Sequence, residues 1–112
     1  MLPKPNRLKK KKDFERVFKL GKGIKQDFIT LKLNRNGLEN SRLGFVVSLK
    51  VSKKAVVRNK VKRRLREIIR ARIKDIKKGL DIVLIALPGS DTKDFEETKK
   101  LVEKLFKKVG IL

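Results

Sequence analysis

Apolar residues near the start of the chain are spaced as on one face of a helix. Phe14, Val17 and Phe18 lie three and four residues apart, which predicts a short amphipathic helix. Asp13 suits its start, either as an N-cap or as an acid in the first turn, where the helix dipole is positive. The glycines within residues 21–23 are expected to end this helix.

The apolar spacing then changes to a period of two, which is typical of strands. Residues 28–33 alternate, so Ile29, Leu31 and Leu33 are expected to share one face of a first strand. Turn-forming residues follow, and residues 42–49 form a second predicted strand that is apolar enough to be central in the sheet.

A long helix is predicted next, with Ser52 as its N-cap and an end near residue 77. Its apolar residues recur every three or four positions and form one stripe: Val57, Val61, Leu65, Ile68, Ile69, Ile73 and Ile76. Gly79 suits the position after the helix, and residues 80–87 form a third, strongly apolar strand.

A last helix is predicted from about Asp94, because Asp94 and Glu97 have the spacing of a capping box. Its apolar side consists of Phe95, Leu101, Val102, Leu105 and Phe106. The order of elements is α-β-β-(β)-α-β-α, with one optional strand before the long helix. This order predicts a single α+β domain over residues 1–112, in which helices pack on a small mixed sheet in two layers.

The charge of the chain indicates a protein that binds a polyanion. The chain has 33 Lys and Arg against 12 Asp and Glu, a formal net charge of +21. Such an excess opposes compaction through self-repulsion unless a polyanion neutralises it, so a nucleic-acid partner is expected. Solubility alone is the competing explanation of a basic surface.

Several classes of protein are excluded by the residues that the chain lacks. It has no Cys and no His, so disulfides, thiolate metal sites and the commonest general base are absent. The acids between Asp91 and Glu97 lie at a helix start, where a capping role is favoured over metal binding. No apolar run is long enough for a membrane span and no signal peptide is evident, so a cytoplasmic location and no membrane partner are expected.

Positive charge gathers in two segments. Residues 1–12 carry six Lys and Arg and no acid, and residues 1–10 are expected to form a flexible basic arm that orders on its partner; a frayed terminus without a role is the alternative. Between Lys50 and Lys74 the only acid is Glu67.

On the long helix, Asn59, Arg63, Arg66 and Arg70 share one face opposite the apolar stripe, with Arg58 and Lys62 nearer its boundary. This pattern indicates phosphate binding in preference to a merely solvated face, but does not separate RNA from DNA.

The sequence around this helix resembles one family. Residues 46–50 (VVSLK) followed by residues 55–67 (AVVRNKVKRRLRE) are similar to the Arg-Asn-Arg signature of bacterial ribonuclease P proteins. Residues 6–18 resemble the N-terminal pattern of the same family, and Arg42-Leu43-Gly44 resembles one of its strands. The resemblance covers roughly residues 6–108.

This resemblance implies a ribosomal protein S5 domain 2-like fold with a left-handed β-α-β crossover, where the general rule would favour the right hand. It implies the protein subunit of a ribozyme that removes the 5′ leader from precursor tRNA. The RNA subunit would carry the Mg²⁺ ions and the catalysis, so no catalytic residue, no metal ligand and no cofactor bound by protein side chains alone is expected. The expected partners are that RNA and precursor tRNA, with no protein partner.

The resemblance also assigns two sets of residues. Residues expected to bind the RNA subunit are Lys53, Lys54, Arg58, Asn59, Lys62, Arg63, Arg66 and Arg70. Residues expected to contact the leader, in a cleft between the first helix and the sheet, are Arg7, Lys9, Phe14, Phe18 and Leu31. For Phe14 and Phe18 a purely structural role in the core remains the alternative.

Two positions depart from the family pattern. Leu49 stands where a Lys is usual, and Leu31 stands at a strand position that is often aromatic, which would weaken base stacking there. The competing hypotheses are a basic ribosomal or assembly protein, a stand-alone endonuclease, and a DNA-binding protein that uses the long helix for recognition.

Overall fold

The computed structural model describes residues 2–112. The helices are α1 (Lys11–Leu20), α2 (Ala55–Arg72) and α3 (Phe95–Lys108), and the strands are β1 (Lys22–Gln26), β2 (Ile29–Arg35), β3 (Arg42–Val47) and β4 (Leu80–Ala86). Short 3-10 turns lie at Lys4–Asn6, Ile73–Asp75 and Ser90–Thr92. Within residues 2–112, no helix combines the length and the apolar character needed to cross a membrane.

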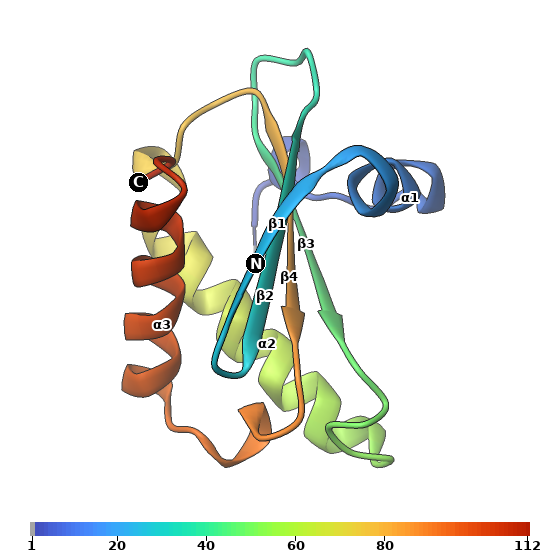
Figure 1. The fold of residues 1–112 in the computed structure, drawn as a ribbon, viewed down its shortest axis with the longest axis vertical. Helices are drawn as coiled ribbons and strands as arrows, with labels where there is room; N and C mark the ends of the chain where they lie inside the picture. Colours follow the sequence, from blue (N-terminus) through green and yellow to red (C-terminus); the bar gives the residue numbers. More distant parts are fainter. Residues whose placement is uncertain (1) are drawn as a thin grey trace.

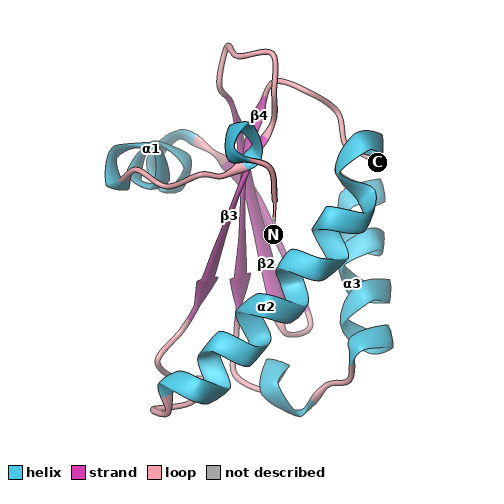
Figure 2. Ribbon diagram, turned by 180° about the vertical axis from the view of Figure 1, so that it is seen from behind, coloured by secondary structure: helices cyan, strands magenta, loops and turns pink. Residues whose placement is uncertain are grey.

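The strands form one mixed sheet in the order β1-β2-β4-β3. β4 is antiparallel to β2 and parallel to β3, and α2 makes the crossover between the two parallel strands. In Figure 2 both parallel strands run downward behind α2 and β4 lies to the right of β3, which makes the crossover left-handed. The predicted two-layer α+β class and the unusual hand are therefore both confirmed.

Two strands of the sheet differ from what the sequence pattern predicted. β3 was expected to be central, but it is an edge strand. It can be apolar at the edge because the N-terminal segment covers part of its outer side, where the Leu8 N–H donates to the Leu43 carbonyl at 2.9 Å. The optional third strand before α2 is present as β1, which precedes both predicted strands and does not follow them as the expected order had it. It is nearly all polar, with Ile24 as its one large apolar residue, and it can be so polar because it pairs only with β2 at the opposite edge.

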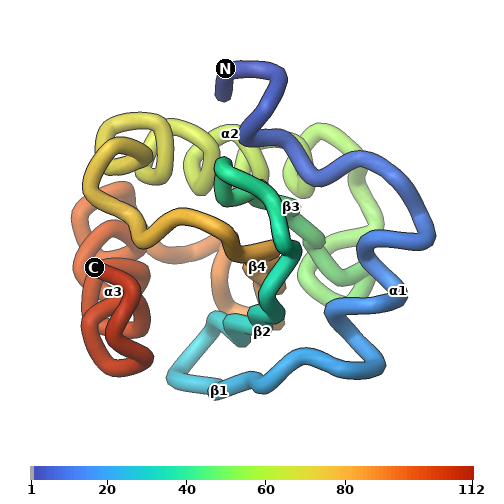
Figure 3. Tube along the Cα trace, turned by 90° about the horizontal axis from the view of Figure 1, so that it is seen from above, coloured from blue at the N-terminus to red at the C-terminus, as the bar shows by residue number. Residues whose placement is uncertain are grey.

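The main core lies between the sheet and the pair α2 and α3. The predicted alternation is confirmed on β2, where Ile29 and Leu31 are fully buried against this layer. The stripe of α2 is buried at Val61, Leu65, Ile68 and Ile69. Figures 1 and 3 show α2 and α3 on one side of the sheet and α1 on the other.

Helix ends differ from the prediction where local geometry decides them. α2 ends at Arg72 and continues only as a 3-10 turn, so Ile76 is buried but lies beyond the helix. Ser52 is not the N-cap: its hydroxyl accepts from the Lys54 N–H at 3.1 Å, and Lys54 holds the cap position without a side-chain bond. Asp94 does cap α3, accepting from the Glu97 N–H at 2.8 Å. Phe95 was expected on the apolar side of that helix but is 42% exposed.

The end of α1 depends on a close approach of main chains. Gly21 follows the helix, as predicted, with an ordinary negative φ of −74°. A Cβ at this position would lie 2.3 Å from the Val17 carbonyl oxygen and 2.8 Å from that of Leu33. Glycine is required here because the chain turns directly against β2, and not because the backbone is left-handed.

The N-terminal segment packs on the domain in this structure, and the flexibility expected for residues 1–10 stays a prediction; Met1 itself lies outside the described residues. Leu2 and Leu8 are buried, and the Asn6 amide donates to the Ser41 carbonyl at 2.8 Å. The Arg7 Nε donates to the Leu2 carbonyl at 2.6 Å. The many lysines of this segment suggested an exposed arm, but Leu2 and Leu8 anchor it to the domain.

Candidate nucleic-acid interface

The exposed face of α2 carries the predicted basic cluster. Asn59, Arg63, Arg66 and Arg70 are all exposed and lie opposite the buried stripe of the helix. Arg70 makes an exposed ion pair with Glu67 at 3.0 Å, the one acid of this helix. The predicted shared face is confirmed, while the binding role of these residues stays a prediction.

The start of α2 adds to the same positive surface. Arg58 is half-buried, and its Nη1 donates to the Ser52 carbonyl at 2.8 Å, which holds the preceding loop against the helix. Lys53 and Lys54 are exposed in that loop, and the first turn of α2 contains no acid. The positive end of the helix dipole and the two lysines therefore lie together, an arrangement that favours anions.

Other arginines of α2 have structural partners. The Arg64 Nη1 donates to the Lys93 carbonyl near the start of α3. Arg72 forms an ion pair with Glu103 of α3, with 2.7 Å between Nη1 and Oε2. These two side chains fix α2 to its neighbours, so some basic residues of this helix are exposed while others hold the fold together.

α1 places two aromatic rings on the other face of the sheet, and the rings differ in environment. Their centroids lie 6.4 Å apart. Phe14 is half-buried and packs with Val46 and Ile85 around the small cluster of Leu8, Val17 and Val83. Phe18 is 39% exposed, and the Lys32 Nζ lies 5.7 Å from its ring centroid. Phe14 thus supports packing, whereas Phe18 presents an accessible ring beside a cation.

Leu31 cannot contact a leader on this face, which corrects its assignment. It has no exposed surface, and its neighbours Ile24 and Leu84 in the adjoining strands face the main core with it. Successive strand residues alternate in direction, so Lys32 lies on the α1 side instead. The period-two pattern already contained this information, because burial of Leu31 implies that Lys32 points to the opposite face.

Gly44 of β3 lets α1 approach the sheet. A Cβ at this position would lie 2.5 Å from two atoms of the Phe14 ring and 3.2 Å from Leu8. In the sequence, this position stood out only through the resemblance of Arg42-Leu43-Gly44 to a family strand. The structure gives the physical reason for a glycine here: the Phe14 ring packs directly against the strand.

Gly44→Ala is expected to destabilise the fold by about 1–3 kcal/mol, because the added methyl group overpacks the contact with Phe14. Urea unfolding followed by circular dichroism measures this loss. Phe14→Leu and the double variant complete a cycle, in which the double variant should lose less than the sum of the two single losses. Additive losses would show that Gly44 and Phe14 are not in direct contact.

An ion-pair network attaches β3 to β4 and to α1 at one end of the sheet. Arg42 donates through Nε and Nη2 to the two carboxylate oxygens of Asp81, at 2.8 and 2.7 Å. The Asn36 amide donates to the same carboxylate at 3.0 Å, and Asp13 lies 3.3 Å from the Arg42 Nη1. The hydrogen bond to Asp81 is the main reason that the pKa of Arg42 is raised above its ordinary value.

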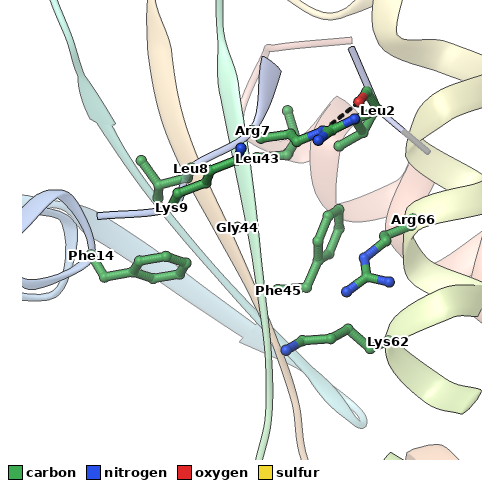
Figure 4. Close-up of a pocket in the computed structure, with 10 residues that line it drawn as sticks. All are labelled: Leu2, Arg7, Leu8, Lys9, Phe14, Leu43, Gly44, Phe45, Lys62 and Arg66. Atoms are coloured by element: carbon green, nitrogen blue, oxygen red, sulfur yellow. Dashed lines mark hydrogen bonds between the residues drawn. The ribbon is translucent and has the colours of Figure 1, made fainter. Parts of the chain in front are cut away.

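A cleft of about 390 Å³ crosses the outer edge of β3, between the basic and the aromatic surfaces (Figure 4). Arg7 and Lys9 lie on its N-terminal side, and Lys62 and Arg66 enter from α2. Its remaining lining consists of Leu2, Leu8, Phe14, Leu43, Gly44 and Phe45. The structure thus brings members of both predicted residue sets to one cleft, which the sequence did not predict.

Comparisons with known proteins agree with this geometry. The family model described as Ribonuclease P matches residues 2–110. The ribonuclease P protein component of Clostridium botulinum is 40% identical over 109 residues, covering 96% of this chain and 97% of its own. The ribonuclease P protein of Thermotoga maritima superposes with a TM-score of 0.83 at 37% identity, covering 91% of this chain and 96% of its own.

A Staphylococcus aureus ribonuclease P protein, described as a mutant with defective mRNA degradation activity, superposes with a TM-score of 0.90 at 29% identity. That match covers 97% of this chain and 92% of its own.

Proposed function

The chain belongs to the ribonuclease P protein family and is a ribonuclease P protein component, and on that premise we propose how its surfaces serve the enzyme. The exposed face of α2 binds the catalytic RNA subunit, and the α1 side of the sheet contacts the 5′ leader of precursor tRNA. A cytoplasmic location follows, because precursor tRNA is made there.

The observation that carries this proposal is the division of cations and aromatic rings between two faces. On one face, the exposed arginines of α2 suit phosphate tracking along structured RNA. On the other, the accessible Phe18 ring beside Lys32 suits a single strand, because bases stack on aromatic rings while cations hold the backbone.

Catalysis is assigned to the RNA subunit with its Mg²⁺ ions. The sequence has no His to act as a general base. Asp94, in its one dense acidic segment, caps α3. The protein chain supplies binding and positioning, and the holoenzyme is the endoribonuclease.

The chain, added to a bacterial ribonuclease P RNA, is expected to restore cleavage of precursor tRNA at the mature 5′ end when Mg²⁺ is too low for the RNA alone. Neutralisation of RNA phosphates by a protein of charge +21 is the physical reason. Gel analysis of end-labelled precursor tRNA measures the product. A basic RNA-assembly protein would bind the RNA without restoring cleavage at that position.

The control is the chain without RNA, incubated with precursor tRNA and, separately, with an mRNA. The mRNA is included because the S. aureus relative is described as a mutant with defective mRNA degradation activity. Specific 5′ maturation by the chain alone would contradict the assignment of catalysis to RNA. Degradation of the mRNA alone would reveal a separate activity.

Phe18→Leu is expected to weaken binding of precursor tRNA by the holoenzyme roughly 5- to 150-fold, from loss of one stacking surface worth about 1–3 kcal/mol. Mature tRNA, which lacks the leader, should bind unchanged. Stability should hardly change, because the ring is 39% exposed. Equal losses for the two tRNAs would place the leader elsewhere. The two affinities are measured by titration in the presence of Ca²⁺ to prevent cleavage.

A further inference from the structure

The cleft at the outer edge of β3 has the composition of a nucleotide site. Its volume of about 390 Å³ falls within the range of roughly 300–1,000 Å³ that is usual for ligand pockets. Four of its lining side chains are cations and none is an acid: Arg7, Lys9, Lys62 and Arg66. In a cleft with an otherwise apolar lining, this excess favours an occupant that carries both phosphate and a flat hydrophobic group.

The main chain of β3 offers hydrogen-bonding groups to such an occupant. The Leu43 carbonyl faces outward, where it accepts from the Leu8 N–H at 2.9 Å. Strand residues alternate in the edge toward which their N–H and C=O groups point, so Phe45 presents its pair on the same outer edge. The pairing of Arg7 with Leu43 is an isolated bridge and does not extend to Phe45.

The cations are placed on both sides of this strand edge. Figure 4 shows Arg66 and Lys62 reaching from α2 toward Phe45, while Arg7 extends toward Leu2 and Lys9 lies beside Leu8 on the other side of β3. The Arg7 guanidinium is oriented by its bond to the Leu2 carbonyl, and no hydrogen bond or ion pair from the described part of the chain occupies its Nη groups. An extended sugar-phosphate chain that passes over the edge would meet cations before and after it.

We propose that this cleft takes one unpaired nucleotide of the RNA subunit. Its base lies on the apolar lining and bonds to the Phe45 main chain, and its flanking phosphates meet the two pairs of cations. The RNA subunit is the favoured source because Lys62 and Arg66 belong to the α2 surface, with which the cleft is continuous. The proposal rests on the proposed function and assigns a specific contact within it.

The absence of cysteine from the chain allows a site-specific test. Lys9→Cys, on the rim of the cleft, is labelled with a thiol-reactive aryl azide, bound to the RNA subunit without tRNA and irradiated. Primer extension is expected to find one crosslinked nucleotide in an unpaired segment. Lys107→Cys, exposed on α3, is the matched control and should not crosslink to that nucleotide.

Removing the crosslinked base from the RNA then tests the contact with the unmodified protein. An abasic nucleotide at that position should weaken protein binding roughly 5- to 150-fold, the range expected for loss of one stacked base. An abasic site at the adjacent nucleotide should change binding little. Crosslinks confined to base-paired RNA, crosslinks that require a leader-bearing tRNA, or an abasic RNA of unchanged affinity would each overturn the proposal.

The unmodified chain is first shown to bind the RNA and to restore cleavage at low Mg²⁺. Failure at that stage contradicts the proposed function. Success there followed by a negative crosslinking or abasic result contradicts only the nucleotide site.

Discussion

Arg42→Met is expected to lower the free energy of unfolding by about 3–5 kcal/mol, because it leaves the buried Asp81 carboxylate without its cation. Methionine keeps the apolar stem of the side chain, so the loss reports mainly on charge and hydrogen bonding. Among residues 2–112, only the Asn36 amide, at 3.0 Å, would remain as a side-chain donor to Asp81. The free energy of unfolding of a small domain is about 5–15 kcal/mol in total, so this substitution would remove a large part of it.

Two comparisons separate this effect from a general loss of positive charge. Arg70→Met removes an exposed pair with Glu67 and is expected to change stability by less than about 1 kcal/mol. The double variant Arg42→Met/Asp81→Leu should recover much of the loss, because the buried Asp81 carboxylate is removed together with its cation and only the weaker contact of Arg42 with Asp13 is lost. Urea unfolding followed by far-ultraviolet circular dichroism is the measurement, since the chain has no Trp. Equal losses for Arg42→Met and Arg70→Met would contradict an anchoring role of the Arg42–Asp81 pair.

This network shows where sequence patterns stop being informative. The helices and β2, β3 and β4 were predictable, because apolar periodicity reports directly on which face of an element is buried. Asp81 lies inside the strongly apolar segment of β4, and its partner Arg42 is 39 residues away. A pair that joins two strands distant in sequence depends on the sheet order, which the local pattern does not contain.

The candidate site was predictable on α2 and only partly so elsewhere. A helix has a fixed angular repeat, so the shared exposure of Asn59, Arg63 and Arg66 followed from spacing alone. Which strand residues line the α1 side of the sheet is decided by which ones pack on the main core. Leu31 was expected on the α1 side but is buried in the core. The cleft at β3 was missed because its parts come from three separate segments of the chain.

The arginines of α2 show a further limit. Arg63 and Arg64 are adjacent in sequence and chemically identical, yet Arg63 is exposed while Arg64 donates to the Lys93 carbonyl. Which of them is free for RNA is decided by the position of the segment that precedes α3. A charge count would treat both as binding residues.

The double variant Arg63→Ala/Arg66→Ala is expected to weaken binding of the RNA subunit on the order of 100-fold at moderate salt, taking about 1.5 kcal/mol for each lost charged hydrogen bond. The slope of log affinity against log salt should become shallower by about 0.7–0.9 for each phosphate contact that is lost. Both side chains are exposed, so folding should be retained. Relief of like-charge repulsion along α2 should, if anything, raise stability slightly.

The matched control is Lys107→Ala/Lys108→Ala, which removes two exposed positive charges at the end of α3. If binding depends on the α2 face, this control should keep nearly the full affinity and salt slope, although its net charge falls by the same amount. Filter binding over a series of salt concentrations measures both quantities, and circular dichroism confirms that each variant is folded. Equal losses for the two double variants would show that RNA binding follows net charge and not the face formed by Asn59, Arg63, Arg66 and Arg70.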